Sequence, residues 1–268
     1  MFETRINNTI KLLPIILVLT IFIACEKGND FDDPDYPTTI KELSQQEITA
    51  IVNRVEQTPL WGCVAIDYYG SPIMTINDEC IDSEWRMDFT EKELEHFAKE
   101  EFYKYRNFLN IQSPENVNIL SITTLNNIRF QQFTTQHPDS MPTAWKITTT
   151  QQNFNGYEVL GTTLRMILSP NGAISISGQW YNNIYIPQTS GYSEDEMREN
   201  LMGSTFTHGR NTLIVTEETS WHASKIVILP IKRSGEIELH VCRAMYPQGW
   251  EILIDNYTGE ELSSIKVN

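Results

Sequence analysis

The chain has 268 residues and a formal net charge of −15, with 40% hydrophobic and 10% aromatic residues. This composition is sufficient for a folded core and excludes a chain that is disordered throughout. The negative charge would repel a phosphate backbone, so it argues against nucleic-acid binding, and it indicates no particular substrate. The length allows one large domain or two of ordinary size.

Residues 1–24 have the pattern of an export signal. Arg5 and Lys11 give a basic start, and the apolar run LLPIILVLTIFIA follows at 12–24, which is short for a bilayer span. The run leads into Phe-Ile-Ala-Cys at 22–25, which resembles a bacterial lipobox, where the cysteine is acylated. We therefore expect a lipoprotein signal peptide and a lipid on Cys25 that anchors the protein in a membrane. An ordinary secretory signal and an uncleaved anchor are the alternatives.

Residues 25–38 are acidic, contain Gly and Pro, and show no periodicity. Such a composition predicts a solvated tether. An acidic run behind a lipidated cysteine also resembles the surface-export signal of Bacteroidetes lipoproteins, and a plain periplasmic spacer is the alternative. The expected location is therefore the bacterial outer membrane, at the cell surface or on the periplasmic face.

Two capping-box sequences predict the first helices of an N-terminal α+β domain, which we place at 39–188. Ser44 is followed at three residues by Glu47, and Thr90 by Glu93, a spacing at which side chain and backbone exchange hydrogen bonds. Apolar residues at helical spacing follow each box. The second box predicts the best helix of the chain, of about 20 residues, with one apolar face turned to the core.

Three cysteines besides Cys25 remain for the folded part. Cys63 and Cys80 flank a predicted turn region and are the expected disulfide, which would contribute about 3 kcal/mol by constraining the unfolded chain. Cys242 would then be unpaired.

A run of hairpins begins at AWKITTTQQ, residues 144–152. Asn155-Gly156 and Asn171-Gly172 predict tight turns in which both central residues have positive φ. Apolar and polar residues alternate along 163–168 and 174–177, which predicts an antiparallel sheet with a helix on one side.

The pattern breaks at 187–192, so we place a domain boundary there, with a second domain at 189–268. Ser193 and Glu196 form a third capping box in front of a short helix. Strands are expected at 212–217, 225–231, 236–245 and 250–255. The second half thus repeats the first in outline, a helix and then an antiparallel sheet, and the fold class is α+β.

Two groups of segments resemble known modules. NFNGYEVLG at 153–161 with PNGAISISG at 170–178 resembles the propeptide motif of fungalysin and thermolysin-like metalloproteases. Residues 193–203, ELHVCR at 238–243 and WEILIDNYTGE at 250–260 resemble the PepSY domain, which commonly follows that motif. The resemblance covers about residues 90 to 265.

The resemblance implies two cystatin-like units, each a helix packed on an antiparallel sheet. It also implies a module that inhibits or chaperones a protease, so the expected partner is a secreted or periplasmic protease. No protease segment follows in these 268 residues, so we expect a stand-alone, non-enzymatic protein. The alternative is a surface lipoprotein that binds glycan or peptidoglycan.

No catalytic motif accompanies these modules. None of the five histidines is followed by Glu, as a zincin helix would require, and the chain has neither a Gly-x-Ser-x-Gly elbow nor a phosphate-binding loop of the Walker or dinucleotide type. We therefore expect no enzymatic activity and no cofactor.

Glu238, His240 and Cys242 are the one local cluster with metal-binding chemistry, because alternation places them on the same face of one strand. A flat strand spaces them about 7 Å apart, and a fourth ligand is not evident. We therefore expect no metal and interpret the cluster as a half-exposed strand face with a reduced cysteine.

Two aromatic groups are candidate binding surfaces. One contains Trp61, Tyr68 and Tyr69, and the other contains Trp180, Tyr181 and Tyr185. The second follows the motif sheet directly and enters a polar loop, so it is the preferred ligand-binding candidate. Burial in a core or at a sheet edge is the competing interpretation of both groups.

Overall fold

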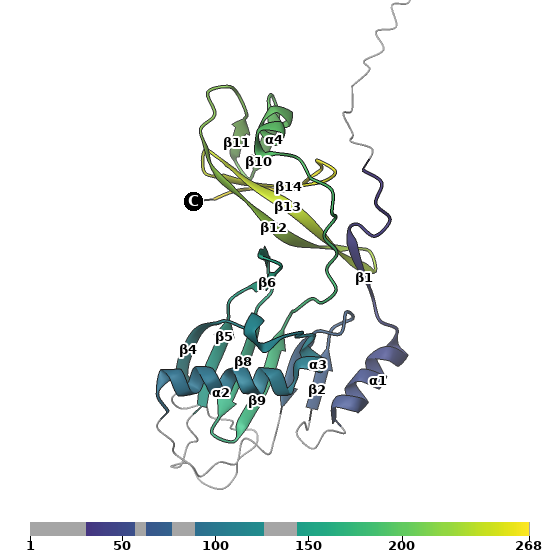
Figure 1. Ribbon diagram of the computed structural model, residues 1–268, viewed down its shortest axis with the longest axis vertical. Coiled ribbons are helices and arrows are strands. Elements are labelled where there is room, and N and C mark those ends of the chain that lie inside the picture. The colour runs from purple at the N-terminus through teal and green to yellow at the C-terminus, as the bar shows by residue number, and fades with distance from the viewer. Residues whose placement is uncertain (1–30, 57–62, 77–88, 126–143, 268) are drawn as a thin grey trace, which may run out of the picture.

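The computed structural model describes residues 31–56, 63–76, 89–125 and 144–267. It is an α+β fold with few helices and several antiparallel sheets, arranged as two units that each carry a helix on a sheet (Figure 1). Within the described residues, no helix is long and apolar enough to cross a membrane. The predicted signal peptide and Cys25 lie outside these residues.

The N-terminal unit is a four-stranded antiparallel sheet covered by one helix. Helix α2 (Glu91–Lys104) turns Leu94, Ala98 and Phe102 into the core. The sheet supplies Trp145, Ile147, Leu164, Met166, Leu168 and Ile176 to the same core. Its strand order is β4 (Ile119–Leu125), β5 (Ala144–Thr149), β8 (Leu164–Ser169) and β9 (Gly172–Gly178).

Helix α2 begins as the sequence predicts but ends earlier. The Thr90 hydroxyl accepts the backbone N–H of Glu93, and the Glu93 carboxylate accepts the N–H of Thr90. The predicted single helix of about 20 residues breaks at Tyr105, and the short helix α3 (Arg106–Leu109) follows. Asn110 then ends α3 in the left-handed conformation, with φ of 57°.

Further elements flank this unit on its β9 side. The hairpin of β2 (Cys63–Ile66) and β3 (Pro72–Ile76) lies beside β9. The Thr75 hydroxyl binds the backbone of Ile176, accepting its N–H at 2.7 Å. Helix α1 (Gln45–Glu56) contacts β2, and its capping box is confirmed because the Glu47 N–H donates to the Ser44 hydroxyl. The turn η2 (Pro114–Asn116) leads from α3 into β4.

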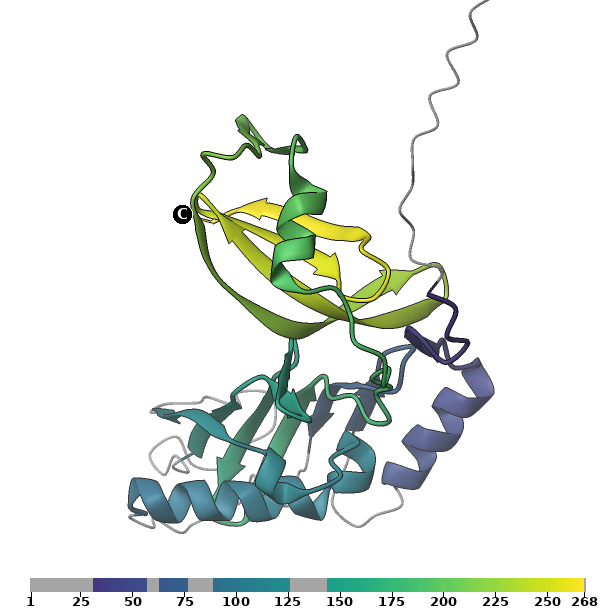
Figure 2. The same ribbon diagram turned by 45° about the horizontal axis from the view of Figure 1, so that its top comes forward.

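The C-terminal unit is a larger sheet with helix α4 (Glu194–Leu201) on one face (Figure 2). Met197 and Leu201 of α4 pack against Met245, Ile252 and Ile254. The strands from this part of the chain are β12 (Trp221–Arg233), β13 (Glu236–Pro247), β14 (Trp250–Asp255) and β15 (Glu261–Lys266). A separate hairpin consists of β10 (Thr205–His208) and β11 (Asn211–Ile214). The sequence patterns missed β10 and β15.

Three strands from before the predicted boundary at 188/189 join this C-terminal sheet. The order is β15-β14-β13-β12-β7-β6, and β1 (Thr38–Lys41) pairs with the remaining edge of β13. Strands β6 (Gln152–Phe154) and β7 (Tyr157–Val159) form the hairpin around Asn155-Gly156, and β7 runs parallel to β12. The C-terminal sheet is therefore not built from residues 189–268 alone.

The two predicted tight turns differ from each other. Asn155 and Gly156 both have positive φ, 52° and 89°, as predicted. At the second turn only Gly172 has positive φ. Pro170 is the first loop residue there, and its ring fixes φ near −65°. The prediction of two positive φ values at Asn171-Gly172 was therefore wrong.

The last residues of the predicted tether are packed against the fold. The ring of Phe31 stacks on Tyr257 with centroids 5.2 Å apart, and Tyr36 is buried. Both aromatic rings join the hydrophobic core beside β13. A solvated tether therefore extends no further than the residues before Phe31.

Candidate functional site

A cluster of polar side chains lies where the edge of β13 changes partner. Strand β1 pairs with β13 as far as Leu239, and β14 pairs with it from Cys242 onward. The Tyr36 hydroxyl fills the gap between them and accepts the backbone N–H of Val241 at 3.0 Å. A residue just before β1 thus satisfies a donor that neither neighbouring strand reaches.

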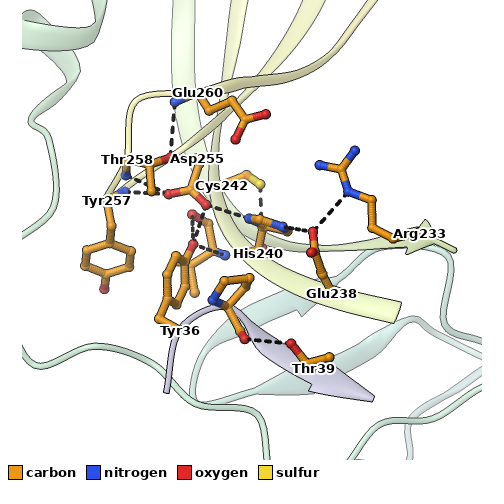
Figure 3. Close-up of polar contacts among 12 residues, drawn as sticks. Tyr36, Thr39, Arg233, Glu238, His240, Cys242, Asp255, Tyr257, Thr258 and Glu260 are labelled. Atoms are coloured by element: carbon orange, nitrogen blue, oxygen red, sulfur yellow. Dashed lines mark hydrogen bonds and ion pairs between the residues drawn. The ribbon is translucent and has the colours of Figure 1, made fainter. Parts of the chain in front are cut away.

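Asp255, at the end of β14, is the centre of this cluster (Figure 3). One carboxylate oxygen accepts the Tyr36 hydroxyl at 2.6 Å and lies 2.7 Å from Nδ1 of His240. The other accepts the backbone N–H groups of Tyr257 and Thr258 at 2.8 and 2.9 Å. Both oxygens of a fully buried carboxylate are therefore satisfied.

His240 links Asp255 to the surface. Its Nε2 lies 3.0 Å from the carboxylate of Glu238, which also accepts Nε of Arg233 at 3.1 Å. Charges of alternating sign therefore run from Arg233 through Glu238 and His240 to Asp255. We call Tyr36, Asp255, His240, Glu238 and Arg233 the Tyr36–Arg233 cluster.

The electrostatics of the cluster favour the ion pairs. Burial alone would lower the pKa of His240, but the hydrogen bonds to Asp255 and Glu238 outweigh it and raise that pKa above its ordinary value. Burial alone would raise the pKa of Asp255, but hydrogen bonds from His240, Tyr36 and two backbone N–H groups lower it. Burial, followed by the charge of Asp255, raises the pKa of Tyr36. These shifts all favour a protonated His240 between two carboxylates and a neutral Tyr36 phenol.

Cys242 does not complete a metal site with Glu238 and His240. Its thiol is buried, its pKa is raised by burial, and it contacts the backbone carbonyl of His240 at 3.6 Å. Among the described residues, no group of three or more His, Cys, Asp or Glu side chains is placed to hold a metal ion. Glu238 and His240 instead bind each other.

In this arrangement the Tyr36–Arg233 cluster has a structural role. Both ring nitrogens of His240 face carboxylates, so the imidazole has no free nitrogen with which to activate a nucleophile. The cluster ties β1, β13 and β14 together. Sequence reasoning missed Tyr36 because it stood in the acidic tether. Asp255 belongs to the segment 250–260 that resembles PepSY, but nothing in the sequence predicted its contact with His240.

The preferred aromatic group is mostly buried. Trp180 is in the core of the N-terminal unit and Tyr181 in the core beside β13, and each is 5% exposed. Tyr185 is half-buried and donates to Asp33 at 2.8 Å. These three residues therefore do not form the exposed aromatic surface that the sequence suggested, because the loop packs between the units. Trp61 of the other group lies outside the described residues.

Residues from both aromatic groups meet at a cleft between the two units. Tyr69 comes from the β2–β3 turn and Tyr181 from the segment after β9, and both line a cavity of about 190 Å³. We call it the inter-unit cleft. Its lining is Asp67, Tyr68, Tyr69, Gln179, Tyr181, Pro230, Lys232 and Ile237. Tyr68 is 60% exposed, and the Lys232 ammonium lies 5.2 Å from the Tyr69 ring centroid.

The predicted disulfide and lipidation sites remain predictions. Cys63 begins β2, is exposed, and pairs in register with Ile76 of β3. Cys80 and Cys25 lie outside the described residues.

Comparison with known proteins assigns no family. No family model matches the chain, and no curated protein matches it. Among solved structures, the chain is similar to the C-terminal domain of YpeB from Bacillus megaterium, with a TM-score of 0.31 and 12% identity. The match covers 85% of this chain and 99% of that one. A likeness at this TM-score carries no argument about the function of this protein.

Proposed function

We propose that the protein is a non-enzymatic, exported lipoprotein whose folded part is a protein-binding module that inhibits or chaperones a secreted protease. The observation that carries the proposal is the place of the β6–β7 hairpin. This propeptide-like hairpin extends the PepSY-like sheet, with β7 beside β12 and β6 at the edge, so the two resembling segments lie in one sheet. The resemblance to protease propeptides, which implies two cystatin-like units, is the reason for proposing a protease as the partner.

The polar residues support binding more than catalysis. The charged side chains of the Tyr36–Arg233 cluster bind one another and the backbone, so their chemistry is used within the fold. Meanwhile β4, β6 and β15 end their sheets, and among the described strands each forms a hydrogen-bonded ladder on one side only. Such edges are where proteins commonly recruit extended segments of partners.

Mixing the purified protein with the mature metalloproteases secreted by the same organism tests the proposal. We expect a complex on size-exclusion chromatography, together with lowered protease activity or a higher yield of refolded protease. Bovine trypsin, an unrelated serine protease, is the control. Absence of both a complex and any change in activity across the metalloproteases would rule the function out.

A glycan- or peptidoglycan-binding lipoprotein is the second candidate. The exposed Tyr68 at the inter-unit cleft favours it, because sugar rings stack on aromatic side chains. Retention on a glycan array that disappears in Tyr68→Ser would support this role. An array without any retained glycan would count against it.

A further inference from the structure

Strand β12 has an outer edge that its neighbour covers only in part. Strand β7 pairs with Val227 and Ile228, and the Leu160 N–H donates to the Ile228 carbonyl at 2.8 Å. Backbone groups alternate between the two edges of a strand. Ile228, Pro230 and Lys232 therefore face the outer edge, while Leu229 and Ile231 face β13. In the part of the chain that the structure describes, no strand pairs with this edge beyond Ile228.

Pro230 is consistent with an open edge at this point. A proline has no N–H to donate, so in sheets it is confined to positions where that donor would face away from a ladder. The ladder between β12 and β13 continues through Pro230 to Arg233 without a register shift. The outer edge therefore offers the carbonyl of Pro230 and both backbone groups of Lys232 to an incoming strand.

The inter-unit cleft lies beside this open edge, because Pro230 and Lys232 are among the residues that line it. Tyr68, Tyr69 and Tyr181 provide aromatic walls. The cleft, of about 190 Å³, is large enough to receive one bulky side chain in place of water. An extended segment that pairs with β12 would direct alternate side chains toward this face.

Lys232 adds a charge preference. Its side chain is exposed and lies over the Tyr69 ring, and within the described residues it forms no ion pair with a carboxylate. A partner residue that passes this ammonium is favoured if it is acidic. Asp67, on the cleft wall, is occupied in part, because its Oδ1 accepts the N–H groups of Tyr69 and Ser71.

We propose that an extended segment of a partner polypeptide adds to the outer edge of β12 at Pro230 and Lys232. One of its bulky apolar or aromatic side chains enters the inter-unit cleft, and an acidic residue nearby pairs with Lys232. The inference rests on the proposed protein-binding function and gives that function a surface. A sugar would use the tyrosines but would leave the backbone groups of β12 unused, so a polypeptide fits the edge better.

Overlapping synthetic peptides from the secreted metalloproteases of the same organism are the probe. Retained peptides are titrated by fluorescence anisotropy against wild type, Tyr68→Ser and Lys232→Pro. The proline removes an outward donor and leaves the β13 ladder intact. Ile73→Ser is the matched control, because Ile73 is on the same hairpin, is 60% exposed like Tyr68, and does not line the cleft. Thermal melts of all variants verify folding.

We expect retained peptides to contain a bulky apolar residue near an acidic one. Tyr68→Ser and Lys232→Pro should each weaken binding about tenfold, as truncation of a central contact commonly does, and Ile73→Ser should leave it unchanged. Equal binding by all variants would overturn the cleft proposal, as would glycan retention that depends on Tyr68 without any peptide retention.

Intact proteases tested in parallel separate the two proposals. If intact proteases bind but no peptide depends on Tyr68 and Lys232, the cleft proposal fails and the proposed function stands. If peptides depend on both residues but no intact protease binds or changes activity, the protease role fails and the cleft remains a peptide site. If neither probe binds, both proposals are wrong.

Discussion

The Tyr36 hydroxyl does two things at once: it donates to the buried Asp255 carboxylate and accepts the N–H of Val241. Removing it leaves a backbone donor without a partner and a carboxylate with one hydrogen bond fewer. Both groups lie where water does not easily replace the lost bonds, which makes the loss costly.

Tyr36→Phe should therefore lower the free energy of unfolding by about 2 kcal/mol, measured by urea denaturation. Tyr185→Phe is the control, because that hydroxyl also binds an aspartate but is half-buried, so we expect a smaller decrease. Equal decreases for the two variants would contradict the special role of Tyr36.

His240 makes stability depend on pH. Its pKa in the folded protein lies above the unfolded value of about 6.5, so the folded state binds more protons in this range. The free energy of unfolding should fall as pH rises from about 6.5 through the folded-state pKa of His240. The stabilisation by His240 should be fully present below about pH 6.5. Urea denaturation across this range should show the slope in wild type and in His222→Gln, whose histidine is exposed, but not in His240→Gln. A slope that persists in His240→Gln would assign the effect to another group.

Gly178, which ends the propeptide-like Ser-x-Ser-Gly sequence, is required by close packing as well as by φ. Its φ is 131°, and an added Cβ would lie 2.0 Å from the carbonyl oxygen of Thr163. Gly156 has a similarly positive φ of 89° but open space around it. We expect Gly178→Ala to lower the free energy of unfolding by at least about 3 kcal/mol and Gly156→Ala by about 1 kcal/mol. Similar values from thermal melts would show that conformation alone explains both glycines.

At the level of elements, strands from the first half of the chain complete the sheet of the second half. Strand β1 fills the edge of β13 that β14 leaves open, and the β6–β7 hairpin covers part of the opposite edge of the sheet, on β12. The connections that carry these strands run between the units in both views (Figures 1 and 2). Each unit therefore has its own core, but the C-terminal sheet depends on segments that lie early in the sequence.

Val159→Ala tests this dependence. Val159 of β7 is fully buried in the core beside β13, so truncation should cost about 2 kcal/mol. Hydrogen exchange should show lost amide protection in β12 and β13, with little change in β5. Equal losses in β5 would show that the hairpin stabilises both units alike.

At the level of the whole molecule, the packed residues from Phe31 onward place the fold close to the proposed anchor. Only residues 26–30 separate Cys25 from Phe31, a span of at most about 20 Å when extended. A lipid on Cys25 would thus hold the C-terminal sheet, to which Phe31 and β1 attach, near the membrane.

Cys25→Ser tests the anchor. Wild type should incorporate labelled palmitate in cells and fractionate with the outer membrane, whereas Cys25→Ser should do neither. Incorporation that survives in Cys25→Ser would refute lipidation at this residue. Cys242→Ser is the control, because that thiol is buried in the sheet.

Local patterns in the sequence determined the helix starts, most hairpins and the α+β class. Capping boxes at Ser44, Thr90 and Ser193 and the Asn155-Gly156 turn act within a few residues, so their effect does not depend on the rest of the fold. Tertiary structure alone decided that Tyr36 meets Asp255, that Trp180 and Tyr181 are buried, and that β7 pairs with β12. Those contacts join residues far apart in the chain, as Tyr36 and Asp255 are by 219 positions, and no local periodicity records such a pairing.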